Sequence, residues 1–93
     1  MIGSFKGKFA EQVAAGKVPK GFAPDLLRPS QRKLAALMSA MTLDDLRVPP
    51  GNRLEALSGN SAGQHSIRIN DQWRICFRWI DRRAEDVEIV DYH

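Results

Sequence analysis

The stretch from Gln64 to Trp79 constrains the fold most, because apolar and polar side chains alternate along it on both sides of a polar turn at 70–72. A period of two is typical of a half-buried strand, so the stretch predicts a β-hairpin with one apolar and one polar face. The last run, Glu85–His93, also alternates and is expected to pair antiparallel with the second hairpin strand. The apolar positions of the hairpin are His65, Ile67, Ile69, Trp73, Ile75, Phe77 and Trp79.

The N-terminal third predicts an edge strand and a short helix. Met1–Phe5 suits a first strand or the edge of one. Apolar residues four apart predict a short amphipathic helix within Lys8–Ala15, and Gly16 follows as a stop signal. Lys17–Pro29 contains three prolines and is interpreted mainly as a loop.

A longer helix is predicted to begin at Ser30, whose hydroxyl is suited to accept a hydrogen bond from a backbone N–H of the first turn. Leu34, Leu37, Met38 and Met41 then recur at the i, i+3, i+4, i+7 spacing of one helix face. We expect all four to lie in the core.

Two further signals complete the order of elements. Thr42 and Asp45 have the spacing of a capping box that starts one more helical turn, and Arg53–Leu57 is read as a short strand. The order predicts an α+β fold with an N-terminal strand and two helices packed on an antiparallel sheet of about four strands. The 93-residue length suits a single domain over 1–93.

Composition limits the setting of the chain. A single cysteine, Cys76, allows no internal disulfide and no all-cysteine metal site, so we interpret it as incidental. No apolar run approaches the roughly 18 residues of a membrane helix, and the N-terminus lacks the apolar core of a signal peptide. We therefore expect a cytoplasmic protein with no membrane association, metal or other cofactor.

Charge is distributed unevenly. Residues 1–80 carry 12 Lys or Arg against 6 Asp or Glu, whereas residues 81–93 carry 2 against 5. A basic body can attract nucleic acid or an acidic protein without sequence specificity. Ordinary solubility charge is the simpler interpretation, and composition alone slightly favours it.

The polar side of the predicted sheet carries residues suited to phosphate chemistry. Arg74 and the terminal Asp91, Tyr92 and His93 are expected to share it. Arginine matches two phosphate oxygens with a planar fork, and histidine titrates near neutral pH, at about 6.5. The interpretation requires Arg74 and His93 to converge on one solvent-facing hollow.

The sequence PPGNRLEALSGNSAGQHSIRINDQWRICFRW, with VEIVDYH at the end, resembles the HigB branch of the RelE/ParE toxin superfamily of bacterial type II toxin–antitoxin modules. The resemblance covers essentially the whole chain and is strongest over Pro49–His93. It implies a ribosome-dependent mRNA endonuclease that is neutralised by a HigA-like helix-turn-helix antitoxin, with operator DNA reached only through the antitoxin complex.

The resemblance also implies roles for residues. Arg74 matches the phosphate-contacting arginine of the family, and Asp91, Tyr92 and His93 match its C-terminal Asp-Tyr-His. Two positions depart from the pattern: Ser58 stands where some relatives carry lysine, and Glu55 where they carry histidine.

Arg53, Arg68 or Arg78 is a candidate to supply the second cation near the phosphate, and the sequence does not choose among them. Arg32, Lys33 and Arg47 form either a solvated face or a basic patch that touches ribosomal RNA. These six residues are the expected contacts to RNA or the ribosome.

Metal-free cleavage would have the ribose 2′-OH attack the adjacent phosphorus. His93 suits proton transfer, and Arg74 suits the phosphoryl oxygens. Asp91 can hold His93 or accept a proton, and Tyr92 can stack on a base or donate its phenolic proton.

Other interpretations stay open. A ParE-like toxin would inhibit DNA gyrase by binding alone, and a non-enzymatic nucleic-acid module would also be basic. Arg74 can be an exposed arginine paired with Asp91 or Glu88, and His93 an idle chain end. His65 continues the apolar register, so we interpret it as a structural, hydrogen-bonded histidine.

Overall fold

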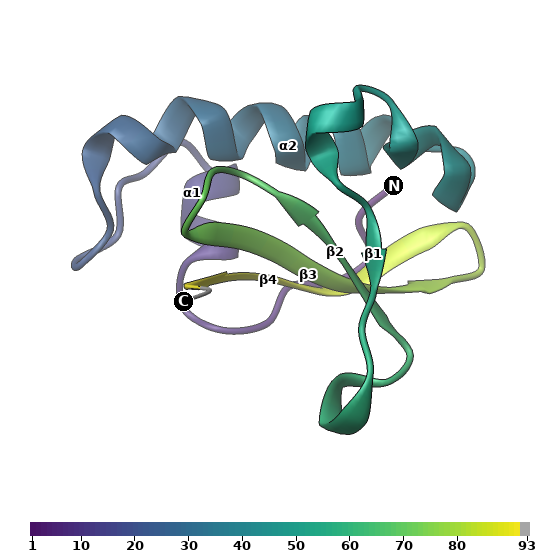
Figure 1. The fold of residues 1–93 in the computed structure, drawn as a ribbon. Coiled ribbons are helices and arrows are strands. Elements are labelled where there is room, and N and C mark those ends of the chain that lie inside the picture. Colours follow the sequence, from purple (N-terminus) through teal and green to yellow (C-terminus); the bar gives the residue numbers. More distant parts are fainter. Residues whose placement is uncertain (92–93) are drawn as a thin grey trace.

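A computed structural model describes residues 1–91 and confirms the predicted α+β fold (Figure 1). Two helices lie on one face of a four-stranded antiparallel sheet with the order β1-β2-β3-β4. The helices and strands are α1 (Ala10–Ala14), α2 (Leu27–Ser39), β1 (Glu55–Ala56), β2 (Gln64–Arg68), β3 (Trp73–Ile80) and β4 (Arg83–Asp91). Short 3-10 helices cover Pro24–Leu26, Leu43–Arg47, Pro50–Asn52 and Gly59–Ser61. Within residues 1–91, no helix has the length and apolar character needed to cross a lipid bilayer.

The core lies between the sheet and the helices, as the alternation predicts. Ile75 and Phe77 of β3 are fully buried, and Leu37 of α2 is buried with them. Trp73 lies at one end of this layer, 5.5 Å from the ring of Phe22 in an edge-on arrangement. Truncating a buried leucine such as Leu37 to alanine typically costs about 2–5 kcal/mol, so the helix depends on this contact.

The N-terminal segment, residues 1–6, forms the edge predicted for it, through two isolated parallel bridges to β4. The Ser4 hydroxyl donates to Oε1 of Glu85 and accepts from the backbone N–H of Asp86, both at 2.8 Å. Gly3 lies so close to the Glu85 side chain that a Cβ added at Gly3 would be 2.0 Å from a carboxylate oxygen of Glu85. The segment therefore covers the edge of β4 that would otherwise be open to pairing.

A β-bulge in β4 changes which of its residues face the helices. The register passes from Cys76↔Glu88 to Arg78↔Glu85, so β4 contains one extra residue there. Asp86 supplies it, with a left-handed φ of 52°. Ala84 and Val87 are both fully buried although they are three residues apart, and the odd-numbered positions face the core beyond the bulge.

The predicted start of the long helix is wrong. α2 begins at Leu27, and Ser30 lies inside its first turn, fully buried and with no hydrogen-bond partner for Oγ among residues 1–91. Pro24 opens the preceding 3-10 helix and Pro29 lies in the first turn of α2. Backbone N–H groups at these positions have no partner within the helix, so proline is tolerated where the sequence suggested a loop.

The expectation that Met38 and Met41 belong to the core is also wrong. Leu34 and Leu37 are buried against the sheet, but Met38 is 53% exposed and Met41 is 68% exposed. Met38 lies on the flank of α2. Met41 follows the helix end, where Ala40 adopts an extended backbone and the helical period no longer applies.

The local signals after α2 are confirmed. Thr42 Oγ1 accepts from the backbone N–H of Asp45, and the Asp45 side chain accepts in return from the N–H of Thr42, which completes the capping box. The short strand predicted within Arg53–Leu57 is present as the two residues of β1, Glu55–Ala56.

Candidate active site

Arg74 is held at the base of the polar side of the sheet by hydrogen bonds to two neighbouring segments. Its Nε donates to Oγ of Ser66 at 2.9 Å, and its Nη2 donates to the backbone carbonyl of Arg53 at 2.7 Å. The carboxylate of Glu55 lies 4.0 Å from Nη2. These contacts fix the orientation of the guanidinium plane.

Arg74 is only 9% exposed, so the alternative interpretation of Arg74 as an exposed strand arginine is wrong. The alternation assigns Arg74 to the polar face but does not reveal that the turn before β1 bends over that face. A buried guanidinium is tolerated because polar atoms replace the water that it loses. Ser66, a fully buried residue that the sequence analysis did not single out, supplies one of these atoms.

The turn that carries Arg53 is itself braced. Arg53 follows the 3-10 helix Pro50–Asn52 and has a left-handed backbone, with φ 47°. The fully buried Asn52 side chain donates to the carbonyls of Leu46 and Val48 at 3.1 and 3.3 Å. This bracing supports the turn that presents the Arg53 carbonyl to Arg74.

An open polar hollow of about 260 Å³ lies at this place. It is lined by Arg53, Glu55, Arg68, Asn70, Asp71 and Arg74. Three of these side chains are cations and two are carboxylates, and Arg68 pairs with Asp71. The hollow is therefore a net cationic site in which one cation, Arg74, is held rigidly. Two of the six predicted RNA contacts, Arg53 and Arg68, lie here.

The other predicted contacts divide into two groups. Lys33 of α2 donates to Oδ1 of Asn52, next to the hollow. Burial lowers the pKa of Lys33 below its usual value, and the charges of Arg32 and Arg68 lower it further. Lys33 and Arg32 therefore extend the cationic region towards α2.

Arg47 and Arg78 do not line the hollow. Arg47 is exposed and pairs with Asp44 at 3.0 Å. Arg78 has Nε 3.8 Å from Asp86 and lies beside Gly63, at the other end of the β2–β3 pair from Arg68. Among the candidates for a second cation near Arg74, the structure thus places Arg53 and Arg68 in the hollow and Arg78 outside it.

Asp91 is placed differently from the prediction. It pairs with Trp73, whereas Arg74 pairs with Val90. Adjacent residues of a strand project to opposite faces, so Asp91 and Arg74 belong to opposite sides of the sheet. Oδ2 of Asp91 accepts from Nε2 of Gln72 at 3.1 Å at the end of the strand. The expectation that both residues share one exposed face is therefore wrong, and Tyr92 and His93 lie outside the described residues.

Comparisons with known proteins agree on one family. The family model described as the RelE-like toxin of the type II toxin-antitoxin system HigB matches residues 4–93. The chain belongs to the HigB-like toxins. An antitoxin is accordingly a partner that its family implies.

Individual relatives agree with this membership. Toxin HigB-1 of Vibrio cholerae is 42% identical over 78 residues, which cover 83% of this HigB-like chain and 82% of that protein. An uncharacterized protein of Haemophilus influenzae is 34% identical over 56 residues, covering 60% of this chain and 55% of that one. Two structures of YafQ from E. coli, one of them a histidine-to-glutamine mutant, share the fold at 12% and 11% identity, with TM-scores of 0.58 and 0.60. Each structural match covers 98% of this chain and 93% of the YafQ chain.

The two positions at which this HigB-like toxin departs from the expected pattern are now located. Glu55 lies on β1 with its carboxylate on the hollow, so a negative charge stands beside Arg74. Ser58 is exposed and precedes the 3-10 helix Gly59–Ser61. Of these two positions, only that of Glu55 lines the hollow.

Two other reactive side chains lie outside the candidate site of the HigB-like toxin. The ring of His65 stacks on Phe77, with centroids 6.1 Å apart. Its Nδ1 is buried without a hydrogen-bond partner among residues 1–91, so the expectation of a hydrogen bond is wrong for that atom. Cys76 is buried, and this burial raises the pKa of its thiol. Within the described part of the chain, no three His, Cys, Asp or Glu side chains gather as a metal site would require.

Proposed function

We propose that this toxin is an endoribonuclease that cuts messenger RNA on translating ribosomes. The observation that supports it best is the orientation of Arg74, fixed by Ser66 and Arg53 at the base of an open cationic hollow. A positive group held in place before the reaction stabilises charge that develops on phosphoryl oxygens without reorganising. Arginine keeps that charge at every relevant pH.

The proposed reaction needs no metal. The ribose 2′-oxygen attacks the adjacent phosphorus while its proton passes to a base. The bond from phosphorus to the 5′-oxygen breaks, and that oxygen takes a proton from an acid. The products are a 2′,3′-cyclic phosphate and a free 5′-hydroxyl.

The roles at the C-terminus are part of the proposal. His93 transfers the proton, since an imidazole titrates near neutral pH. Tyr92 stacks on a base or donates its phenolic proton. Asp91 belongs to the opposite side of the sheet from Arg74, so we assign it to positioning the end of β4 rather than to contact with the phosphate.

In this proposal, the ribosome aligns the message in the active site of the toxin. Holding the message in the reactive geometry can contribute several kcal/mol, on the order of 7–11 in favourable cases. Arg53 and Arg68 line the hollow with Arg74, and Lys33 and Arg32 extend the positive charge towards α2, which suits contact with RNA phosphates. Arg47 and Arg78 are proposed as peripheral contacts. We also propose a cytoplasmic location and a HigA-like helix-turn-helix antitoxin that links the toxin to operator DNA.

The test compares purified toxin on naked message and on translating ribosomes, with and without Arg74→Ala. We expect in-frame cuts only on ribosomes, and at least a hundredfold loss of rate in the variant, as is typical of removing one transition-state contact. Arg82→Ala, at an exposed arginine in the β3–β4 turn, is the matched control. Intact transcripts together with inhibited DNA gyrase would instead assign the chain to the binding toxins.

A further inference from the structure

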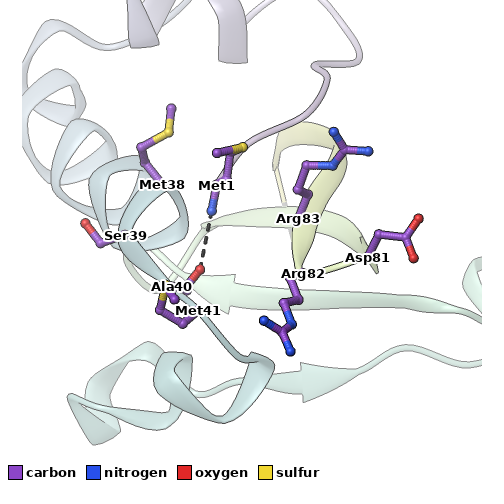
Figure 2. Close-up of a pocket in the computed structure, with 8 residues that line it drawn as sticks. All are labelled: Met1, Met38, Ser39, Ala40, Met41, Asp81, Arg82 and Arg83. Carbon is purple, nitrogen blue, oxygen red and sulfur yellow. Dashed lines mark hydrogen bonds between the residues drawn. The ribbon is translucent and has the colours of Figure 1, made fainter.

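An apolar trough runs along one flank of α2, away from the candidate active site. It consists of two adjoining hollows that share Met38, of about 230 and 350 Å³. The first lies between the α2 stripe Gln31, Leu34, Ala35, Met38 and the N-terminal segment. The second continues past Met41 to the β3–β4 turn, as Figure 2 shows. None of the residues that line this trough lines the hollow around Arg74.

The floor of the trough is exposed and rich in methionine. Met1, Met38 and Met41 are 58%, 53% and 68% exposed. Methionine side chains are flexible and polarizable, and they recur at surfaces that bind the apolar faces of helices. An exposed apolar patch bordered by polar groups is typical of an interaction surface.

The wall opposite α2 is fixed in place. The Met1 ammonium donates to the backbone carbonyls of Leu37 and Ala40 at 3.1 and 3.3 Å, and the bond to Ala40 is drawn in Figure 2. The trough is therefore formed before any partner binds, which limits the entropy that binding costs.

The borders of the trough are mainly cationic. Arg82 of the β3–β4 turn and Arg83 at the start of β4 lie at one end, with Asp81 beside them (Figure 2), and Arg83 pairs with Glu85 at 3.4 Å. Arg28 and Arg32 lie along the outer ridge of α2, next to Gln31 and Ala35. An apolar strip between arginines complements a helix with an apolar stripe and acidic flanks.

We propose that this trough binds an amphipathic, acidic helix of the cognate antitoxin. The stripe on α2 has the i, i+3, i+4, i+7 spacing along which two helices pack. A second copy of the chain fits less well, since a symmetric contact would bring the same arginines together. RNA fits less well too, because its phosphates gain nothing from a methionine floor. The proposal rests on membership of the toxin–antitoxin family and not on nuclease activity.

The test measures the Kd of the purified toxin for the full-length antitoxin encoded beside it, by calorimetry at two salt concentrations. Ala35→Glu and Met38→Glu place a carboxylate in the trough at exposed positions, so both variants are expected to fold. Val48→Glu is the matched control, because Val48 is 73% exposed and lies outside the trough. We expect each trough variant to weaken binding at least tenfold, as at an interface hot spot, and the control to stay within twofold.

Three results would overturn the proposal. The first is unchanged antitoxin affinity in both trough variants. The second is a toxin dimer in sedimentation that Met38→Glu dissociates without changing the antitoxin Kd, because the trough would then join two copies. The third is an equal loss in Val48→Glu, which would reveal a general charge effect. Because the experiment measures antitoxin binding and not RNA cleavage, failure of the nuclease proposal and failure of the trough proposal can be told apart.

Discussion

The backbone carbonyl of Arg53 accepts a 2.7 Å hydrogen bond from Nη2 of Arg74, which joins residues 21 positions apart. The turn before β1 thereby controls the orientation of a side chain on β3. This arrangement separates two properties of Arg53, because its carbonyl positions Arg74 while its exposed side chain adds charge to the hollow.

Ser66→Ala tests the other support of Arg74. The substitution leaves Nε of a buried guanidinium without its hydroxyl partner, so the free energy of unfolding should fall by about 1–3 kcal/mol. The cleavage rate on ribosomes should fall about tenfold to a hundredfold while ribosome affinity changes little. Ser39→Ala, at an exposed position near the end of α2, should leave both unchanged. A full cleavage rate in Ser66→Ala would show that the orientation of Arg74 does not matter.

Arg53→Gly removes a charge and keeps the carbonyl that Arg74 needs. Glycine suits the left-handed backbone at φ 47°, so stability should stay within about 1 kcal/mol. Together with Arg68→Ala, the change should weaken ribosome binding and reduce its salt dependence by about 0.7–0.9 in log–log slope per lost phosphate contact. Arg78→Ala should have a smaller effect, because Arg78 lies outside the hollow. If filter-binding assays gave Arg78→Ala the same effect as the changes at Arg53 and Arg68, ribosome binding would depend on total charge and not on the position of the arginines.

Removal of His93 tests the proposed proton transfer. Cells that express the chain ending at Tyr92 should survive induction, because the imidazole that titrates near neutral pH is lost. The thermal midpoint should change by no more than about 2 °C, since terminal residues rarely support the core. His93→Gln is the matched variant of full length. Undiminished toxicity of both variants would assign the proton transfer to another group.

The capping box predicts an acid-dependent loss of stability. Hydrogen bonds from the backbone N–H groups of Met41 and Thr42 hold the pKa of Asp45 below its ordinary value of 3.8. Because the pKa of Asp45 is lower in the folded state than in the unfolded state, its carboxylate stabilises the fold at pH values above the ordinary pKa. This contribution is lost as the pH falls through the folded-state pKa. In urea unfolding, Asp45→Ala should therefore have a lower free energy of unfolding than the wild type at neutral pH. The two free energies should converge in acid. Asp44→Ala, in the same turn, should show a smaller difference.

Cys76 should react slowly while the chain is folded. Burial raises the pKa of its thiol, and the charge of Glu88 raises it further, whereas Arg74 lowers it. The thiolate is the reactive form, so labelling by an aromatic disulfide at pH 8 should be at least about tenfold slower than in urea. Equal rates would show that β3 opens readily at this position.

The central hairpin of the sheet could be predicted because apolar and polar residues alternate along β2 and β3. The same alternation could not reveal what covers each face. Arg74 follows the polar register, yet it is buried because the turn that carries Arg53 lies over it. Ser30 shows a related limit: its residue type suits a cap, but the helix begins at Leu27, where prolines at first-turn positions are tolerated.

The side of the sheet to which Asp91 belongs follows from the alternation itself, because Asp91 continues the inward register of Val87 and Ile89. The bulge at Asp86 is what the sequence does not reveal: it shifts the inward positions of β4 from even to odd numbers, so that Ala84 and Val87 are both buried. No glycine marks the bulge, although its φ is positive. Of the residues singled out from the sequence, the structure gathers Arg53, Arg68 and Arg74 around one hollow.

The pairing of residues 1–6 with β4 links the beginning of the chain to its end, and the hydrogen bond from Ser4 to Glu85 spans 81 positions. Closing so large a loop is slow compared with forming local hairpins. During synthesis, the sheet edge, the buried Ala84 and the fixed Met1 wall therefore assemble only after β4 has left the ribosomal tunnel. A chain interrupted before that point would lack both the ordered trough and the complete sheet, so prematurely released fragments should be harmless to the cell that makes them.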